Sequence, residues 1–364
     1  MKAGYRMALS ALLCLPIHAV WGQHIRPDQA TLEMLAHTRT SSFRGLSVVD
    51  DSVLWVSGSQ GTVGCSRDGG KTWKWMQIKG AEHLDFRSIK AFNSQKALIV
   101  SAGTPARIYR TTDHGLHWTK TYENEDDRFF LDGLIFWDEN RGLVYGDPID
   151  GHFVLLYTED GGRHWQVLPA AHSPSAQPGE VSFAASGTAI FALPPARVWI
   201  GTGGRTARVH YADDYGKSWR VASPAFLQGK PSQGIFSLAF FNPDQGIAVG
   251  GDYQADSIRA NTAFLTFDGG KTWQRPDTFP RGYRSSVVYL NAQQLIATGK
   301  SGTDFSLDGG KTWHALSDTG FYVVQRAGSG EAVFLAGSEG RIARLKGYPQ
   351  DSQSGEAPAR RQRD

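Results

Sequence analysis

The chain has 364 residues, of which 40% are apolar and 12% aromatic, and its formal net charge is only +3. So small a charge, part of it carried by the C-terminal letters APARRQRD, excludes the basic footprint of a nucleic-acid-binding protein. The 42 glycines, the 16 prolines and the scarcity of helical periodicity favour an all-β fold with many turns.

Residues 1–22 have the pattern of a signal peptide. Lys2 and Arg6 precede the mostly apolar stretch Met7–Val20, which is shorter than the roughly 20 residues that span a bilayer. We therefore expect an exported protein, either periplasmic or extracellular. Removal of the signal leaves Cys65 as the single cysteine, so no internal disulfide can form, and we expect a buried thiol.

The main body of the chain, residues 29–347, is a repeat. A phrase close to S/T-x-D-x-G-x-x-W recurs six times, and its aspartates lie 40 to 54 residues apart. Four short strand-like runs accompany each phrase, which is the content of one propeller blade. The aspartate and tryptophan of the six phrases are Asp68 and Trp73, Asp113 and Trp118, Asp160 and Trp165, Asp214 and Trp219, Asp268 and Trp273, and Asp308 and Trp313.

The two ends of the repeat complement each other. The last unit, FYVVQRAGSGEAVFLAGSEGRIARL, has three strand-like runs and no Asp phrase, and the segment ATLEMLAHTRTSS ahead of the first unit can supply a fourth. We therefore predict an all-β, seven-bladed β-propeller that is closed by the N-terminal strand, because closure removes an open sheet edge. The polar stretch 348–364 is predicted to be a disordered tail.

We interpret the six phrases as turns between a third and a fourth strand. Aspartate accepts hydrogen bonds from nearby backbone N–H groups, glycine allows positive φ, and tryptophan anchors the hairpin. Because His114 and Tyr215 replace the first glycine while Gly115 and Gly216 remain, we expect the second glycine to have the special backbone. Aspartates in six separate blades cannot converge, so they predict neither catalysis nor metal binding.

A second set of residues repeats at the start of the innermost strands, beside one mouth of the channel. Arg44, Arg87 and Arg284 share one position in the aligned units, and Asp132 holds it in the third unit. Guanidinium groups bind carboxylates and phosphates bidentately, so we predict a site for an anionic ligand or a peptide carboxylate. The alternative is that these arginines hold blades together by pairing with acidic residues: Asp132, Asp147, Glu180 or Asp252.

Further candidates follow the second strands of two units. Asp147 and Asp252 stand there, in YGDPIDG and VGGDY, and such loops often carry function. Together with Tyr253 and Glu180 they complete the predicted ligand-binding set, with turn formation as the alternative for the two aspartates. No metal-ligand spacing, P-loop or dinucleotide loop is present, so we expect no metal and no cofactor.

The repeated phrase resembles the Asp-box, or BNR, repeat of sialidases and related propellers. Longer phrases, among them FRGLSVVDDSVLWVSGSQGTV and GIFSLAFFNPDQGIAVGGDY, resemble the bacterial branch of the photosystem II stability/assembly factor-like proteins over Phe43–Leu345. The resemblance implies an exported, non-catalytic scaffold or assembly chaperone that binds a protein client. The photosynthetic members escort a newly made reaction-centre subunit. We expect a monomer that meets membranes only through its client.

Two other functions stay open. A sialidase-like glycosidase would combine arginines with a Tyr–Glu pair such as Tyr253 and Glu180, but the F-R-I-P phrase is absent because Gly45 follows Arg44. The spacing of the carboxyl groups decides whether hydrolysis is feasible. A protein that binds an anionic glycan without cleaving it would use aromatic residues at the channel mouth: Phe236, Tyr253 and Tyr283.

Overall fold

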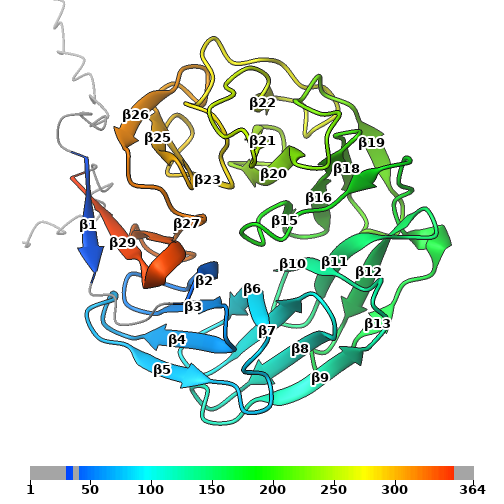
Figure 1. The fold of residues 1–364 in the computed structure, drawn as a ribbon, viewed down its shortest axis with the longest axis vertical. Coiled ribbons are helices and arrows are strands. Elements are labelled where there is room, and N and C mark those ends of the chain that lie inside the picture. Colours follow the sequence, from blue (N-terminus) through cyan, green and yellow to red (C-terminus); the bar gives the residue numbers. More distant parts are fainter. Residues whose placement is uncertain (1–29, 36–40, 348–364) are drawn as a thin grey trace, which may run out of the picture.

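The computed structural model describes residues 30–35 and 41–347, which form seven antiparallel sheets around a central channel (Figure 1). Each sheet is one blade, and one strand of each blade lines the channel. Short apolar runs separated by turn residues produce this fold, because each run is long enough for one strand of a blade and no longer. The predicted seven-bladed, all-β propeller is confirmed.

The first four blades follow the chain in order, from the channel outward. Blade one has β2 (Phe43–Val48), β3 (Leu54–Gly58), β4 (Thr62–Ser66) and β5 (Lys74–Gln77), and blade two has β6 (Asp85–Ala91), β7 (Ala97–Ala102), β8 (Ala106–Thr111) and β9 (Thr119–Asn124). Blade three has β10 (Leu131–Phe136), β11 (Gly142–Ile149), β12 (His152–Thr158) and β13 (Gln166–Val167), and blade four has β15 (Ile190–Leu193), β16 (Arg197–Gly201), β18 (Val209–Ala212) and β19 (Arg220–Ala222).

Blade five is irregular, whereas blade six is regular. Blade five has β20 (Gln233–Phe240), β21 (Gly246–Asp252) and β22 (Ala263–Thr266), with β17 (Gly203–Gly204) and β14 (Glu180–Val181) added beside β20. Its fourth strand is reduced to one bridge between Leu265 and Gln274. Blade six has β23 (Ser286–Tyr289), β24 (Leu295–Gly299), β25 (Gly302–Ser306) and β26 (His314–Ser317). Two short 3₁₀ turns lie in loops: η1 (Ala170–His172) and η2 (Ser338–Gly340).

Blade seven joins the two ends of the chain. It has β27 (Val323–Arg326), β28 (Val333–Ala336) and β29 (Ile342–Lys346), and β1 (Thr31–Leu35) is its fourth strand. β1 pairs antiparallel with β29 along its whole length and lies beside it in Figure 1. Leu32 packs against the core of blades six and seven, and Leu35 against the core of blades seven and one. The predicted closure by the N-terminal strand is confirmed.

The predicted signal peptide, residues 1–22, and the predicted tail, residues 348–364, lie outside the described residues. Within the part of the chain that the structure describes, no helix is long and apolar enough to cross a membrane.

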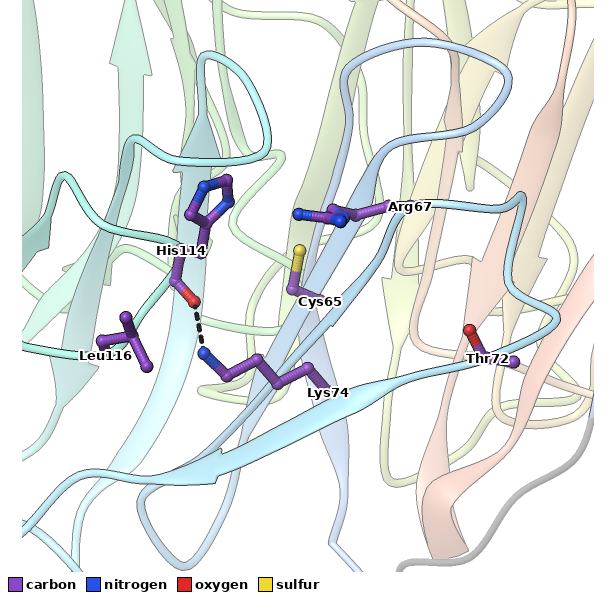
Figure 2. A pocket seen from close by; sticks show the side chains of 6 residues that line it. All are labelled: Cys65, Arg67, Thr72, Lys74, His114 and Leu116. Carbon is purple, nitrogen blue, oxygen red and sulfur yellow. Dashed lines mark hydrogen bonds between the residues drawn. The ribbon is translucent and has the colours of Figure 1, made fainter.

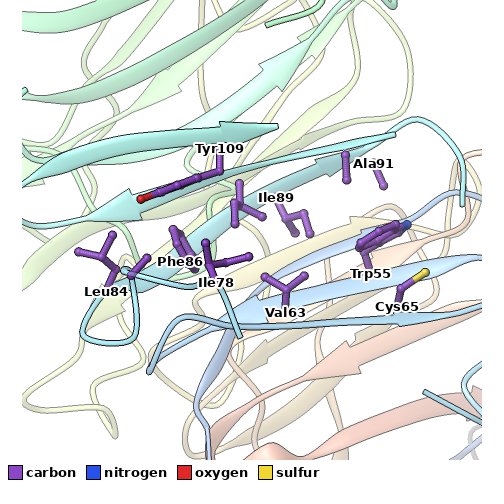
Figure 3. Close-up of a cluster of buried hydrophobic side chains, with 12 residues drawn as sticks. Trp55, Val63, Cys65, Ile78, Leu84, Phe86, Ile89, Ala91 and Tyr109 are labelled. Atoms are coloured by element: carbon purple, nitrogen blue, oxygen red, sulfur yellow. The ribbon is translucent and has the colours of Figure 1, made fainter. Parts of the chain in front are cut away.

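Apolar layers hold adjacent blades together. Between blades one and two, Trp55, Val63 and Phe86 belong to one buried cluster (Figure 3). Trp55 Nε1 also donates a hydrogen bond to the Asn93 carbonyl at 3.1 Å, so the indole is both packed and satisfied. Cys65 is part of the same cluster, and burial raises the pKa of its thiol to about 11. The thiol therefore stays protonated at neutral pH and acts as a small apolar side chain.

The repeated Asp phrases form turns with one hydrogen-bond pattern, and we call them box turns. In the first, Asp68 Oδ1 accepts from the Thr72 backbone N–H at 2.9 Å and from Ser66 Oγ at 2.9 Å. Trp73 Nε1 donates to the Gly70 carbonyl at 3.0 Å. The other five aspartates accept from the backbone N–H four residues on, at 2.9–3.1 Å: Asp113, Asp160, Asp214, Asp268 and Asp308.

Both glycine positions of the box turn have a left-handed backbone. The expectation that only the second glycine has this backbone was therefore wrong. His114 and Tyr215, at the first position, have φ of 61° and 63°. The second position differs in the space available to it. A Cβ atom on Gly115 would lie 2.3 Å from Met76 Sδ of blade one. At Gly115 the neighbouring blade therefore packs against the Cα atom and leaves little room for a side chain, whereas at Gly216 the nearest atoms belong to Trp219 of the same turn.

Candidate functional site

The inner strands bulge at the mouth, which is the end of the channel where these strands begin. In blades one, two, three and five the pairing of the inner strand skips one residue. A bulge leaves the extra residue outside the ladder and redirects its side chain. The skipped residues are Arg44, Arg87, Asp132 and Phe236. The structure therefore brings Arg44, Arg87 and Asp132 to one level of the ring.

Arg284 does not share this level, which corrects its grouping with the other two arginines. The pairing of blade six places Ser285 where blade one has Arg44. Arg284 takes the interior position of Phe43, because an offset of one residue turns a strand side chain to the other face. Its side chain is 0% exposed, and its guanidinium contacts Asp304 at 2.5 and 2.8 Å. Arg284 therefore has a structural role, as in the alternative interpretation, but its partner is Asp304 of its own blade and none of the four acidic residues that this interpretation named.

Arg44 and Arg87 remain as the cationic part of the mouth. Arg44 Nη1 donates to the Ala185 carbonyl at 3.1 Å, and its guanidinium lies 3.9 Å from the centre of the Tyr322 ring. Arg87 Nε contacts Asp85 at 2.7 Å, and the Arg87 side chain is 33% exposed. Burial, and then the charge of Arg87, lower the pKa of Arg44. Two guanidinium groups that repel each other are favourably placed to attract an anion.

The segment Ser182–Gly187 packs into the mouth, and we call it the plug. It connects blade three to blade four and is buried from Ser182 to Ser186. Ser186 Oγ donates to the Ser285 carbonyl of blade six at 2.7 Å. Phe183 stacks on Phe236 of blade five, with ring centres 3.9 Å apart. Together with the contact to Arg44 of blade one, these interactions tie the plug to blades that are far apart in the sequence.

Asp132 and Asp147 form a carboxyl pair beside the plug. Ser182 Oγ lies 2.7 Å from an oxygen of Asp132 and 3.2 Å from one of Asp147. The hydroxyl has one hydrogen, so it can donate to only one carboxylate at a time. Burial, and then the charge of Asp147, raise the pKa of Asp132 well above its usual range, and burial raises the pKa of Asp147. The pair therefore favours keeping a proton.

Replacing Asp132 with asparagine should stabilise the protein at pH 7, because the folded state then no longer has to hold an ionised, buried carboxylate. Folding raises this pKa above 3.8, so ionisation penalises the folded state increasingly as the pH rises above that value. Near pH 3 both forms are neutral, and the difference should vanish. Urea unfolding at pH 7 and at pH 3 measures the difference in unfolding free energy between the wild type and the variant.

Asp252→Asn is the matched control for this prediction. Although burial opposes ionisation, hydrogen bonds from Ser232 and Gln233 lower the pKa of Asp252. The asparagine variant should therefore lose stability at pH 7. A gain of stability at Asp252, or a loss at Asp132, would contradict these protonation states.

The other predicted site residues, Glu180, Asp252 and Tyr253, do not belong to the carboxyl pair or to the pair of arginines. Glu180 contacts Arg208 Nη2 at 2.5 Å in a buried ion pair. Asp252 is 1% exposed and accepts a hydrogen bond from Gln233 Nε2 at 3.0 Å. Both carboxylates are therefore engaged with neighbouring protein groups. Tyr253 is 40% exposed and lies edge-on to the Phe236 ring, so it presents an aromatic surface near the plug.

A different cavity, of about 380 Å³, lies between the box turns of blades one and two (Figure 2). Arg67, Lys74 and His114 line it together with Cys65, and Lys74 Nζ donates to the His114 carbonyl at 3.2 Å. None of the predicted binding residues lines this cavity, and its cysteine is a protonated thiol. We therefore place the candidate site at the channel mouth.

Comparison with known proteins agrees with this architecture. The BNR/Asp-box repeat model matches residues 264–275, which contain the fifth box turn. Photosystem II assembly protein Ycf48 of Synechococcus sp. (strain JA-2-3B'a(2-13)) is 23% identical over 316 residues, which cover 78% of this chain and 87% of that protein. This chain is an Asp-box propeller similar to Ycf48. The resemblance to photosystem II assembly factor-like propellers is confirmed.

Other similarities are more distant or partial. The solved structure of YCF48 bound to D1 peptide has a TM-score of 0.64 at 16% identity, covering 93% of this chain and 100% of that chain. The GH74 xyloglucanase from Xanthomonas campestris has a TM-score of 0.56 at 15% identity. The match covers 86% of this chain and 53% of the xyloglucanase chain. Sortilin of Danio rerio is 22% identical over 290 residues; these cover 74% of this chain but only 31% of sortilin. At such identities the solved structures show the fold alone.

Two parts of this site were not predicted from the sequence. The first is the plug, whose letters SFAASG combine small residues with no strand periodicity, a composition that permits close packing. The second is Asp85, which stands two residues before Arg87, the spacing at which strand side chains share a face.

Proposed function

We propose that this chain is an exported, non-catalytic scaffold that binds a protein client at the channel mouth, as an assembly factor similar to Ycf48. The observation that carries the proposal is the pair of guanidinium groups of Arg44 and Arg87, which lie at one level of the ring and repel each other. Guanidinium groups recognise carboxylates bidentately, so an acidic side chain or a chain end of the client is the group they would hold.

Similarity to Ycf48 supports a protein client over a small substrate. A YCF48 structure was solved with D1 peptide bound, so a propeller of this shape can hold a segment of another protein. For this chain the D1 peptide is a first probe, and the identity of its own client is left to experiment.

A glycosidase is the second candidate, which the similarity to the xyloglucanase and the carboxyl pair favour. Hydrolysis needs two carboxyl groups that face a sugar from opposite sides. Asp132 is 2% exposed, and Ser182 donates its hydroxyl to Asp132 and its backbone N–H to Asp147. A sugar would have to displace the plug before reaching Asp132, so we rank this function second.

Replacing Arg44 and Arg87 together with glutamine should reduce client capture at least about tenfold, since a hydrogen bond to a charged group contributes about 1.5–3 kcal/mol. The tagged protein is exposed to the exported fraction with cross-linking, and the bound proteins are quantified by mass spectrometry. D1 peptide binding is measured in parallel.

Arg128→Gln is the matched control, because Arg128 is an exposed arginine paired with Asp126. It should capture the client as the wild type does. Equal capture by the double variant, together with a lower unfolding temperature, would leave only a structural role for the two arginines. Release of reducing sugar from xyloglucan by the wild type, but not by Asp132→Asn, would favour the glycosidase.

A further inference from the structure

The channel contains a cavity of about 360 Å³ on the far side of the plug from the mouth. Residues from the inner strands of all seven blades line it, from Ser47–Val48 in blade one to Val324–Arg326 in blade seven. In blades one, two, three and five these residues lie in the second halves of their strands, whereas Arg44 and Arg87 lie near the beginnings. The cavity is therefore a separate site.

The wall of this cavity combines apolar and polar surface, and the charged side chains that line it are both cations. Among the described residues that line it there are two cations, Lys90 and Arg326, and no aspartate or glutamate. Arg326 Nη2 contacts Glu331 at 2.7 Å, while its Nε is buried without a hydrogen-bond partner. The remaining lining residues are largely Val, Leu, Ile, Ala and Phe.

Lys90 is the feature that the fold leaves unexplained. It is only partly exposed, and no hydrogen bond or ion pair joins its ammonium group to another described residue. Its contact with the Phe92 ring is a distant one, in which Nζ lies 5.8 Å from the ring centre. Burial lowers the pKa of Lys90. An ammonium group without a counterion costs stability in such surroundings, and a bound anion removes that cost.

We propose that this cavity binds a carboxylate with an apolar body, whose carboxylate contacts the Lys90 ammonium. In small-molecule sites apolar side chains contact the body of a ligand and polar groups fix its orientation, and the apolar side chains and Lys90 of this cavity can take these two roles. Arg326, whose guanidinium is paired with Glu331, adds positive potential on the same wall. The carboxylate belongs either to a free organic acid or to the C-terminus of an apolar peptide. The proposal does not rest on client binding at the mouth.

Sodium hexanoate is the first probe, titrated into the full protein and followed by calorimetry. We expect saturable binding that falls at least about tenfold in Lys90→Met, because a charge-assisted hydrogen bond contributes about 1.5–3 kcal/mol. Hexan-1-ol, which has the same chain length and no charge, should bind at least tenfold more weakly than hexanoate. Lys96→Met is the matched control, since Lys96 contacts Phe92 and Glu139 and does not line the cavity.

An apolar pentapeptide with a free C-terminus, compared with its amidated form, distinguishes the two sources of the carboxylate. Binding of the free form alone supports a chain end, and binding of hexanoate alone supports a free acid. Lys90→Met should fold with an unchanged or higher unfolding temperature, because it removes an unpaired charge. Equal hexanoate affinity in wild type and Lys90→Met, or no saturable binding of either probe, would overturn the proposal.

Discussion

Replacing Asp304 with alanine should lower the free energy of unfolding by about 3–5 kcal/mol, because it leaves a buried charge without its partner. Asp304 is 0% exposed, and its carboxylate contacts Arg284 at 2.5 and 2.8 Å and Arg281 Nε at 2.8 Å. Arg284 is also 0% exposed, so water cannot take the place of the lost carboxylate without opening blade six.

Asp318→Ala is the matched control, and urea unfolding measures both variants. Asp318 also contacts Arg281, at 2.7 Å, but its side chain is 96% exposed. Exposed ion pairs contribute about 0–1 kcal/mol, so this variant should change little. Adding Arg284→Met to Asp304→Ala removes the unpaired charge and should recover much of the loss. Similar losses for the two alanine variants, or no recovery in the double variant, would mean that the buried pair does not stabilise blade six.

The fold was predictable because the box turn is a local structure that marks the same point in each blade. The contacts of Asp68 with Ser66 and Thr72 span only a few residues, so the letters themselves determine the turn. Trp73 stands immediately before β5, and the same phrase precedes the fourth strand of other blades. Closure followed from the same count, because the last unit lacked a fourth strand and the segment before the first unit offered one.

The site was less predictable because it depends on register and on long-range contacts. The letters FRG and YRS look equivalent, yet Arg44 stands on a bulge and Arg284 stands one position earlier, inside the blade. Sequence periodicity does not show which residue a ladder will skip. The carboxyl pair arises in the same way, since Ser182 reaches Asp132 from 50 residues away along the chain.

A chain that starts at Ala36, and so lacks β1, should lose about 2 kcal/mol or more of unfolding free energy. Leu32 and Leu35 are partly buried against two separate cores, so each contributes about half of the roughly 1.5–3 kcal/mol of a fully buried leucine. The truncation also exposes the edge of β29, and an open edge pairs with other chains. Urea unfolding and light scattering should therefore show lower stability and larger species. A chain that starts at Ala30 is the control and should match the full chain in both measurements. If the two truncations behave alike, β1 does not close the ring in solution.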